Sequence, residues 1–279
     1  MIEEHHGFDR VVILSDESAN WQIAGLRQLD RLVLGLDEFA KAMGTANKIE
    51  IVVFWKPAIP LSERWLPKHQ RITRVWLTEA SGSLEPEARI LATRLFIARN
   101  ALSKFFPATP PVKIEQPIVD LTEAWPRLFE QFERTCRSAT RAGEEHWRFL
   151  AQPSEIVASE KQLLRHSGKS QDGMVAKFLN RPISRAITRF LLKLPITPNT
   201  WTISIFALAP VAFVFLVRGD YTGFVAGTAF FQLINILDGC DGEIARAKYL
   251  DSDRCRRLDA FCDFSPNRIF VFCLGLVLF

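Results

Sequence analysis

The sequence predicts a cytoplasmic α/β domain followed by an all-α transmembrane helical domain. Three observations predict this fold class. Short β-branched runs alternate with helix-like stretches in the first half, long runs without charge begin at Trp201, and a strongly basic stretch directly precedes those runs. Alternating strand and helix patterns are typical of layered α/β folds. Long uncharged runs are typical of membrane spans.

Residues 1–155 form the predicted α/β domain, and residues 156–173, which are mostly polar and charged, form the predicted linker. Consecutive β-branched and apolar residues predict strands at Val11–Leu14, Ile49–Trp55 and Ile72–Leu77. Apolar residues at helical spacing predict helices at Ile23–Met43, Glu87–Phe106 and Thr122–Ala142.

Residues 174–279 form the predicted membrane domain. Residues 174–194 alternate basic and apolar positions, which is typical of a helix lying in the membrane interface; a solvated helix of a soluble domain is the alternative. Three spans are predicted, at about residues 199–217, 221–245 and 260–279. Uncharged runs of 17 residues in the first two would cover about 26 Å, so flanking residues complete the crossing of a core about 30 Å thick.

The charge distribution predicts the orientation in the membrane. The formal net charge is +4, but residues 161–193 contain eight basic residues and one acidic residue, a local surplus of seven. Basic residues also follow the second predicted span, whereas Arg218 is the only one between the first two spans. The positive-inside rule therefore predicts an integral protein of the inner (cytoplasmic) membrane with its N-terminal domain in the cytoplasm. Nucleic acid is the rival partner for such a basic stretch, but the adjoining span favours lipid headgroups, and no nucleic-acid partner is expected.

An acidic constellation begins where the second predicted span ends. If that helix continues, Asp238, Asp241, Gly242 and Ala245 share one face, because their offsets are 0, 3, 4 and 7. Two further carboxylates, Asp259 and Asp263, are spaced four residues apart. Four converging carboxylates would repel one another unless divalent cations lay between them, and hard oxygen ligands suit Mg²⁺ or Mn²⁺. The alternative is a charged loop in which neighbouring arginines pair with these aspartates.

The motif Asp238-x-x-Asp241-Gly242-x-x-Ala245-Arg246, followed in register by Asp259 and Asp263, resembles the signature of the CDP-alcohol phosphotransferases. The resemblance covers about residues 160–279. It implies a homodimeric integral membrane enzyme of six spans. Such an enzyme transfers the phospho-alcohol group of a CDP-alcohol, for example a phosphatidyl group, to an acceptor alcohol and releases CMP. The resemblance therefore implies a role in the synthesis of phospholipids or polar phosphodiesters, among membrane lipids.

The same resemblance implies a role for each motif residue. The four aspartates Asp238, Asp241, Asp259 and Asp263 would hold two divalent ions, Mg²⁺ or Mn²⁺. Asp263 would also be the catalytic base that takes the proton from the attacking hydroxyl. Gly242, Ala245 and Arg246 would bind the CDP moiety.

Two departures from the family pattern support a different function. Cys255 stands where the family has its second glycine, and Phe264-Ser265-Pro266 follows the last aspartate. The chain also ends within its third predicted span, whereas the family has six, so we expect a truncated form. The alternative hypothesis is therefore a catalytically inactive, truncated membrane homologue that acts as a binding or structural protein.

The N-terminal domain resembles a nucleotidyltransferase, as found in bifunctional inositol-phosphate cytidylyltransferases of this family. The similar segments are Val11–Ser15 and Ile23–Leu32. An active domain needs a glycine-rich loop after the first strand, whose backbone N–H groups cradle phosphate. Residues Asp16–Trp21 contain no glycine, lysine or arginine and begin with two acids. We therefore expect an inactive domain with a structural or regulatory role.

Overall fold

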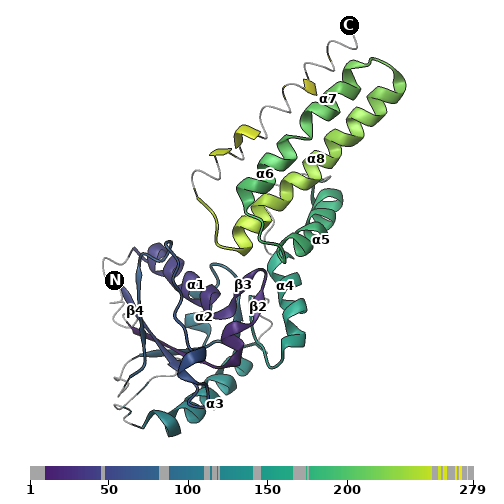
Figure 1. Cartoon of the computed structure of the whole chain (residues 1–279). Coiled ribbons are helices and arrows are strands. Elements are labelled where there is room, and N and C mark those ends of the chain that lie inside the picture. Colours follow the sequence, from purple (N-terminus) through teal and green to yellow (C-terminus); the bar gives the residue numbers. More distant parts are fainter. Residues whose placement is uncertain are drawn as a thin grey trace, which may run out of the picture. The chain divides into compact units, whose positions relative to one another are not determined.

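The structure is a computed structural model. It describes residues 10–44, 48–81, 88–109, 114, 118, 120–140, 146–165, 174, 176–252, 257–258, 260–262, 268, 270–271 and 275. The chain divides into two compact units, Met1–Gln162 and Leu163–Phe279 (Figure 1). Their boundary falls inside the predicted linker 156–173, of which Ile156–Arg165 forms helix α4.

The first unit is built on a parallel sheet, as the α/β prediction requires. Its four strands lie in the order β5-β4-β1-β6, and every neighbouring pair is parallel. The strands are β1 (Arg10–Ser15), β4 (Ile49–Trp55), β5 (Val75–Glu79) and β6 (Arg89–Ala92). Helices α1 (Gln28–Ala42), α2 (Leu102–Ala108) and α3 (Leu121–Thr140) accompany the sheet. Residues Val11–Leu14 are at most 1% exposed, and burial on both faces explains why β1 has no alternation of polar and apolar residues.

The predicted helix Glu87–Phe106 is wrong. This segment contains β6, which pairs with β1, and β7 (Leu95–Ile97), which is antiparallel to β8 (Trp147–Phe149). Only from Leu102 is it helical, as α2. Short apolar runs fit a buried strand and a buried helix equally well, and pairing with distant strands decides between them.

A hairpin precedes α1, where the sequence predicts a helix from Ile23. Strands β2 (Gln22–Ile23) and β3 (Leu26–Arg27) are joined by a two-residue turn in which Ala24 has φ = 50° and Gly25 has φ = 77°. Positive φ at both positions is the type I′ geometry that matches the twist of the strands. The Ala24 N–H donates to Oε1 of Glu160 in α4 at 2.8 Å, which links the turn to the end of the first unit.

The turn makes Ala24 sensitive to branching at Cβ. Ala24 is 1% exposed and lies in the left-handed region, so a valine would add both backbone strain and overpacking. We expect Ala24→Val to lower the free energy of unfolding by about 2–3 kcal/mol. Ala24→Gly should change it by less than about 1 kcal/mol, because glycine accepts this φ but loses a buried methyl group. Urea unfolding followed by tryptophan fluorescence checks both, and equal effects of the two variants would contradict the explanation.

The second unit is helical. A π-helical turn, η4 (Ala176–Asn180), leads into α5 (Arg181–Leu191), followed by α6 (Pro198–Phe206), α7 (Ala209–Val217) and α8 (Tyr221–Ala247). The segments Pro198–Val217 and Tyr221–Ala247, with mean hydropathy 2.1 and 1.3, have the length and composition of membrane spans. The first is interrupted between α6 and α7, because Pro210 has no N–H to donate to the carbonyl of Phe206. Of the twenty residues of the predicted third span, 260–279, thirteen lie outside the described residues, and this span stays a prediction.

Helices α5, α6 and α7 all pack against α8 (Figure 1). Ile205, Ala209, Ala212 and Ile234 form a small core between them. Close approach of α7 depends on Gly227, where a Cβ would lie 2.6 Å from Cγ of Leu216. The most apolar window of each candidate span is only 28% buried, so most of its side chains face outward.

Candidate active site

Helix α8 carries the acidic motif within its last turns. It continues without a break to Ala247, so Asp238, Asp241, Gly242 and Ala245 do lie on one face. Asp220 caps the start of this helix by accepting the N–H of Gly223 at 2.8 Å. The hydrogen bond from the Leu250 N–H to the Ala245 carbonyl, at 2.8 Å, closes its other end.

Helix α6 holds Asp241 in place. Asp241 is 5% exposed, and its Oδ2 accepts a hydrogen bond of 2.6 Å from Oγ1 of Thr202. In the preceding residue, Nε1 of Trp201 donates to the Leu237 carbonyl at 3.0 Å. The start of α6 therefore fixes both the carboxylate and the turn of α8 that carries it. Sequence reasoning missed Thr202, although a hydroxyl within an otherwise apolar run was the available signal.

Gly242 and Arg246 are neighbours on α8. A Cβ at Gly242 would lie 3.1 Å from Nη1 and 3.4 Å from Nη2 of Arg246, so the guanidinium group lies over the glycine. Ala245 on the same face is 4% exposed. The structure thus brings together the three residues for which the resemblance implies contact with CDP.

Only half of the predicted metal ligands lie in the described part of the chain. Asp238 and Asp241 are one turn apart on α8, whereas Asp259, Asp263 and Cys255 lie outside the described residues. Among the described residues, no three histidine, cysteine, aspartate or glutamate side chains gather into a group that could hold a metal ion. Paired carboxylates with a hydroxyl partner do fit the oxygen preference of Mg²⁺ and Mn²⁺, and the complete four-aspartate site stays a prediction.

A third carboxylate in the motif, Glu243, faces away from Asp241. It is fully buried, and its Oε1 accepts a hydrogen bond of 3.1 Å from Oγ of Ser184 on α5. Sequence reasoning assigned it no role because its position in the motif is variable in the signature used. An acidic residue inside a span was the signal that could have found it.

Just beyond α8, Lys248 anchors the connection between α5 and α6. Its Nζ donates to the carbonyl oxygens of Leu194 and Ile196, at 2.9 and 3.3 Å. Burial lowers the pKa of this amine from its ordinary value. Two neighbouring segments therefore contact the acidic end of α8. Helix α6 does so through Thr202, and the α5–α6 connection does so through Lys248.

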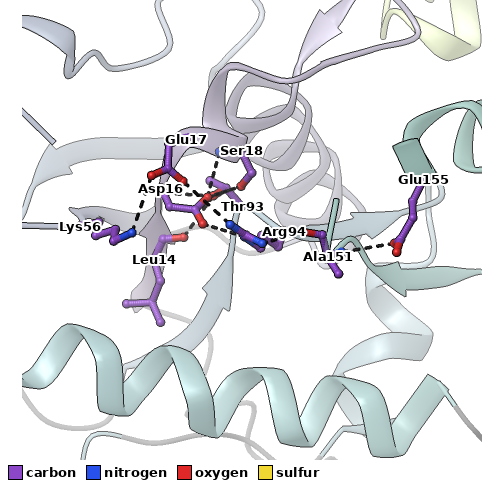
Figure 2. A network of polar contacts seen from close by, with 9 residues as sticks. All are labelled: Leu14, Asp16, Glu17, Ser18, Lys56, Thr93, Arg94, Ala151 and Glu155. Carbon is purple, nitrogen blue, oxygen red and sulfur yellow. Dashed lines mark hydrogen bonds and ion pairs between the residues drawn. The ribbon is translucent and has the colours of Figure 1, made fainter. Parts of the chain in front are cut away.

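The loop after β1 in the first unit is closed by a polar network (Figure 2). Asp16 is 2% exposed and caps the short helix η1 (Glu17–Asn20). Its Oδ1 accepts from the N–H and the hydroxyl of Ser18, at 2.9 and 2.5 Å, and its Oδ2 accepts from Nε of Arg94 at 2.7 Å. Arg94 in turn donates to the Ala151 carbonyl at 2.8 Å.

This network occupies three backbone donors that a phosphate would need. The N–H of Ser18 donates to Asp16, the N–H of Ala19 donates to the Asp16 carbonyl, and the N–H of Trp21 donates to the Ser18 carbonyl. Glu17 adds a second acid, which lies 3.6 Å from Nζ of Lys56. A phosphate-binding loop instead points its backbone N–H groups at the ligand.

The fold and site define a class: a parallel α/β unit joined to a helical unit whose span-length helix ends in an acid-rich, glycine-containing motif. Residues 195–279, the C-terminal part of the chain, match the family described as CDP-alcohol phosphatidyltransferase.

Curated relatives are proteins named "Bifunctional IPC transferase and DIPP synthase". The protein from Rubrobacter xylanophilus is 36% identical over 130 residues, which are 47% of this chain and 29% of the relative. The protein from Thermococcus kodakarensis is 34% identical over 138 residues, 49% of this chain and 31% of the relative. The protein from Aquifex aeolicus is 30% identical over 147 residues, 50% of this chain and 32% of the relative. The matched part of the chain thus spans about a third of these relatives' length.

Proposed function

We propose that the protein transfers the phospho-alcohol group of a CDP-alcohol to an acceptor alcohol and releases CMP. The family match of residues 195–279, with the motif on one face of α8, carries this proposal. Names of relatives that pair a transferase with a synthase support an enzyme over the inactive alternative. Two substrate classes are to be compared. One is an alcohol bearing a phosphate, as in polar phosphodiester synthesis, and the other is a phospholipid precursor.

Some residues of α8 would bind metal ions, and others would bind the nucleotide. Asp238 and Asp241, together with Asp259 and Asp263, would hold two Mg²⁺ or Mn²⁺ ions. When bound, such ions neutralise a pyrophosphate and stabilise the oxygen that leaves with CMP. Arg246 lies over Gly242, where a guanidinium fork can donate two hydrogen bonds to a phosphate. Asp263 would take the proton of the acceptor hydroxyl.

We further propose that α6–α7 and α8 cross a membrane, with α5 lying at its cytoplasmic surface. Outward-facing side chains along both candidate spans support this arrangement. Phe178 in η4 and Ile183 and Phe190 in α5 are 71, 40 and 65% exposed, while Arg185 and Arg189 of α5 are partly exposed. Exposed apolar side chains next to basic ones suit the boundary between acyl chains and anionic headgroups. The resemblance adds a homodimer to this proposal.

For the first unit we propose a structural or regulatory role without nucleotidyl transfer. The closed loop at Asp16 supports this, because the N–H groups of Ser18, Ala19 and Trp21 already donate within the loop. Incubation of the protein with CTP and inositol phosphate should give no CDP-alcohol. Appearance of that product at a rate comparable to CMP release would contradict the proposal.

The phosphotransfer proposal is tested with the full-length protein in membranes. We expect CMP release that requires both a CDP-alcohol and an added divalent ion, and that stops with EDTA and returns with Mg²⁺ or Mn²⁺. Release that continues after chelation, or that occurs without an acceptor at the same rate, would count against it. CDP-inositol and CDP-diacylglycerol, each offered with inositol phosphate or free inositol, separate the substrate classes.

Gly242→Ala should separate nucleotide binding from folding. Alanine favours the helix interior by about 1 kcal/mol over glycine, so the variant should fold at least as stably. Its Cβ would meet Nη1 of Arg246 at 3.1 Å and displace the guanidinium. We expect KM for the CDP-alcohol to rise about 10-fold, equivalent to about 1.4 kcal/mol of binding. Thr228→Ala, at an exposed position earlier on α8, is the control, and an unchanged KM for Gly242→Ala would remove Arg246 from the nucleotide site.

A further inference from the structure

Glu243 is a buried carboxylate inside the proposed catalytic motif, yet it lies on the side of α8 that faces α5. Its Oε1 accepts a hydrogen bond of 3.1 Å from Oγ of Ser184 and lies 3.5 Å from Nη1 of Arg181. Glu243 is fully buried and the Arg181 side chain is 11% exposed, so this pair is shielded from water. At about 100° per residue, Glu243 points about 200° away from Asp241 around the helix. It therefore lies across the helix from the proposed metal ligands.

Further contacts between the same two segments surround this pair. Nε2 of Gln232 donates to Oδ1 of Asn180 at 2.8 Å, and Sγ of Cys240 lies 3.6 Å from the Ser184 carbonyl. At Gly239 a Cβ would lie 3.3 Å from Nη1 of Arg181 and 3.5 Å from Cβ of Ser184, so α5 approaches the bare backbone there. Arg181 is thus placed beside the residue that follows Asp238.

Burial of a carboxylate is unfavourable unless its partners compensate for the lost water. Thr188 and Arg185 of α5 also lie near this carboxylate, although Oε2 of Glu243 has no hydrogen bond of standard geometry among the described residues. An apolar side chain here would pack α5 and α8 together without that penalty. The carboxylate does what an apolar residue cannot: it fixes the rotation and register of α5 through directional contacts to Ser184 and Arg181.

We propose that Glu243 is a positioning residue for phosphotransfer, which holds α5 and the Arg181 guanidinium against the motif-bearing part of α8. This inference rests on the proposed function for its catalytic consequence, but its structural half stands independently. Without Glu243, α5 keeps its apolar contacts but loses the carboxylate that Ser184 and Arg181 contact on α8. Arg181 is then held less firmly next to Gly239, although Gly242, Ala245 and Arg246 are unchanged.

The test compares the full-length wild type with Glu243→Ala, Glu243→Gln and the control Thr228→Ala. Thr228 is an exposed residue of α8 whose hydroxyl donates to the Phe224 carbonyl of its own helix. Hydrogen exchange of the α5 amides, with the α4 amides as internal reference, reports whether α5 is held. CMP release, divided by the number of CDP-alcohol binding sites, gives kcat per intact site and excludes loss through unfolded protein.

In Glu243→Ala we expect the α5 amides to exchange at least about 10-fold faster and kcat per site to fall at least about 10-fold with KM for the CDP-alcohol nearly unchanged. Glu243→Gln keeps an accepting oxygen for Ser184, so both effects should be smaller, and Thr228→Ala should behave as wild type.

If Glu243→Ala does not fold, Glu243→Gln and Ser184→Ala carry the same comparison. Wild-type α5 protection, or faster exchange with unchanged kcat per site, would overturn the proposal. If the wild type itself releases no CMP, the proposed function fails, and the exchange data alone decide whether Glu243 holds α5.

Discussion

Asp241→Asn is expected to abolish CMP release, with kcat/KM at least about 1,000-fold below wild type, or about 4 kcal/mol of transition-state stabilisation. Asparagine retains the size of the side chain and can still accept the hydrogen bond from Thr202, so the fold should be unchanged. What it loses is the negative charge that a divalent ion needs as a ligand. The measurement is divalent-dependent CMP release in membranes, with protein amount and circular dichroism matched to wild type.

Thr202→Val provides the comparison for Asp241→Asn. It removes only the hydroxyl that orients the carboxylate, so we expect an effect of about 10- to 100-fold, as for other partners of metal ligands. At saturating metal, the rate of CMP release should decrease from wild type to Thr202→Val and again to Asp241→Asn. Retention of more than a tenth of wild-type activity by Asp241→Asn would show that this carboxylate is not a metal ligand.

Arg94→Ala is expected to lower the free energy of unfolding of the first unit by about 3–5 kcal/mol. Its Nε bonds to the Asp16 carboxylate, which is 2% exposed on its side chain, and removing the arginine leaves a buried charge without its cation (Figure 2). The guanidinium also connects this loop to Ala151, near the end of the unit. Urea unfolding followed by tryptophan fluorescence reports this unit, because Trp201 is the only one of the seven tryptophans outside Met1–Gln162.

Arg134→Ala is the matched surface control for Arg94→Ala. Arg134 pairs with Glu130 one turn earlier on α3, and both side chains are well exposed, at 76 and 63%. Exposed pairs contribute little to stability, so we expect a change within about 0.5 kcal/mol. If Arg94→Ala has no larger effect than Arg134→Ala, the Asp16 network is not what closes the loop after β1.

Local patterns predict some elements of this chain well and others poorly. Residues Ile49–Trp55 form β4 as predicted, because a strand with six of its seven positions buried has few alternatives in an α/β layer. The segment Glu87–Phe106 was predicted as one helix, but its two strands pair with β1 and with β8, which lie far away in sequence. Long-range pairing leaves no periodic trace in so short a run.

The candidate site divides in the same way. Spacing alone places Asp238, Asp241, Gly242 and Ala245 on one helix face, because a helix turns by a fixed angle per residue. Spacing says nothing about Thr202 or Ser184, because these residues reach α8 from other helices.

The sequence by itself determined the α/β class of the first unit, the apolar helices of the second and the motif face of α8, because each follows from the pattern of apolar residues or the spacing within single segments. Only the tertiary structure decided that Thr202 holds Asp241, that Glu243 faces α5 and that Asp16 and Arg94 close the loop after β1. These contacts join residues from 39 to 78 positions apart. Such pairings depend on how whole elements pack, and local sequence carries no record of that packing.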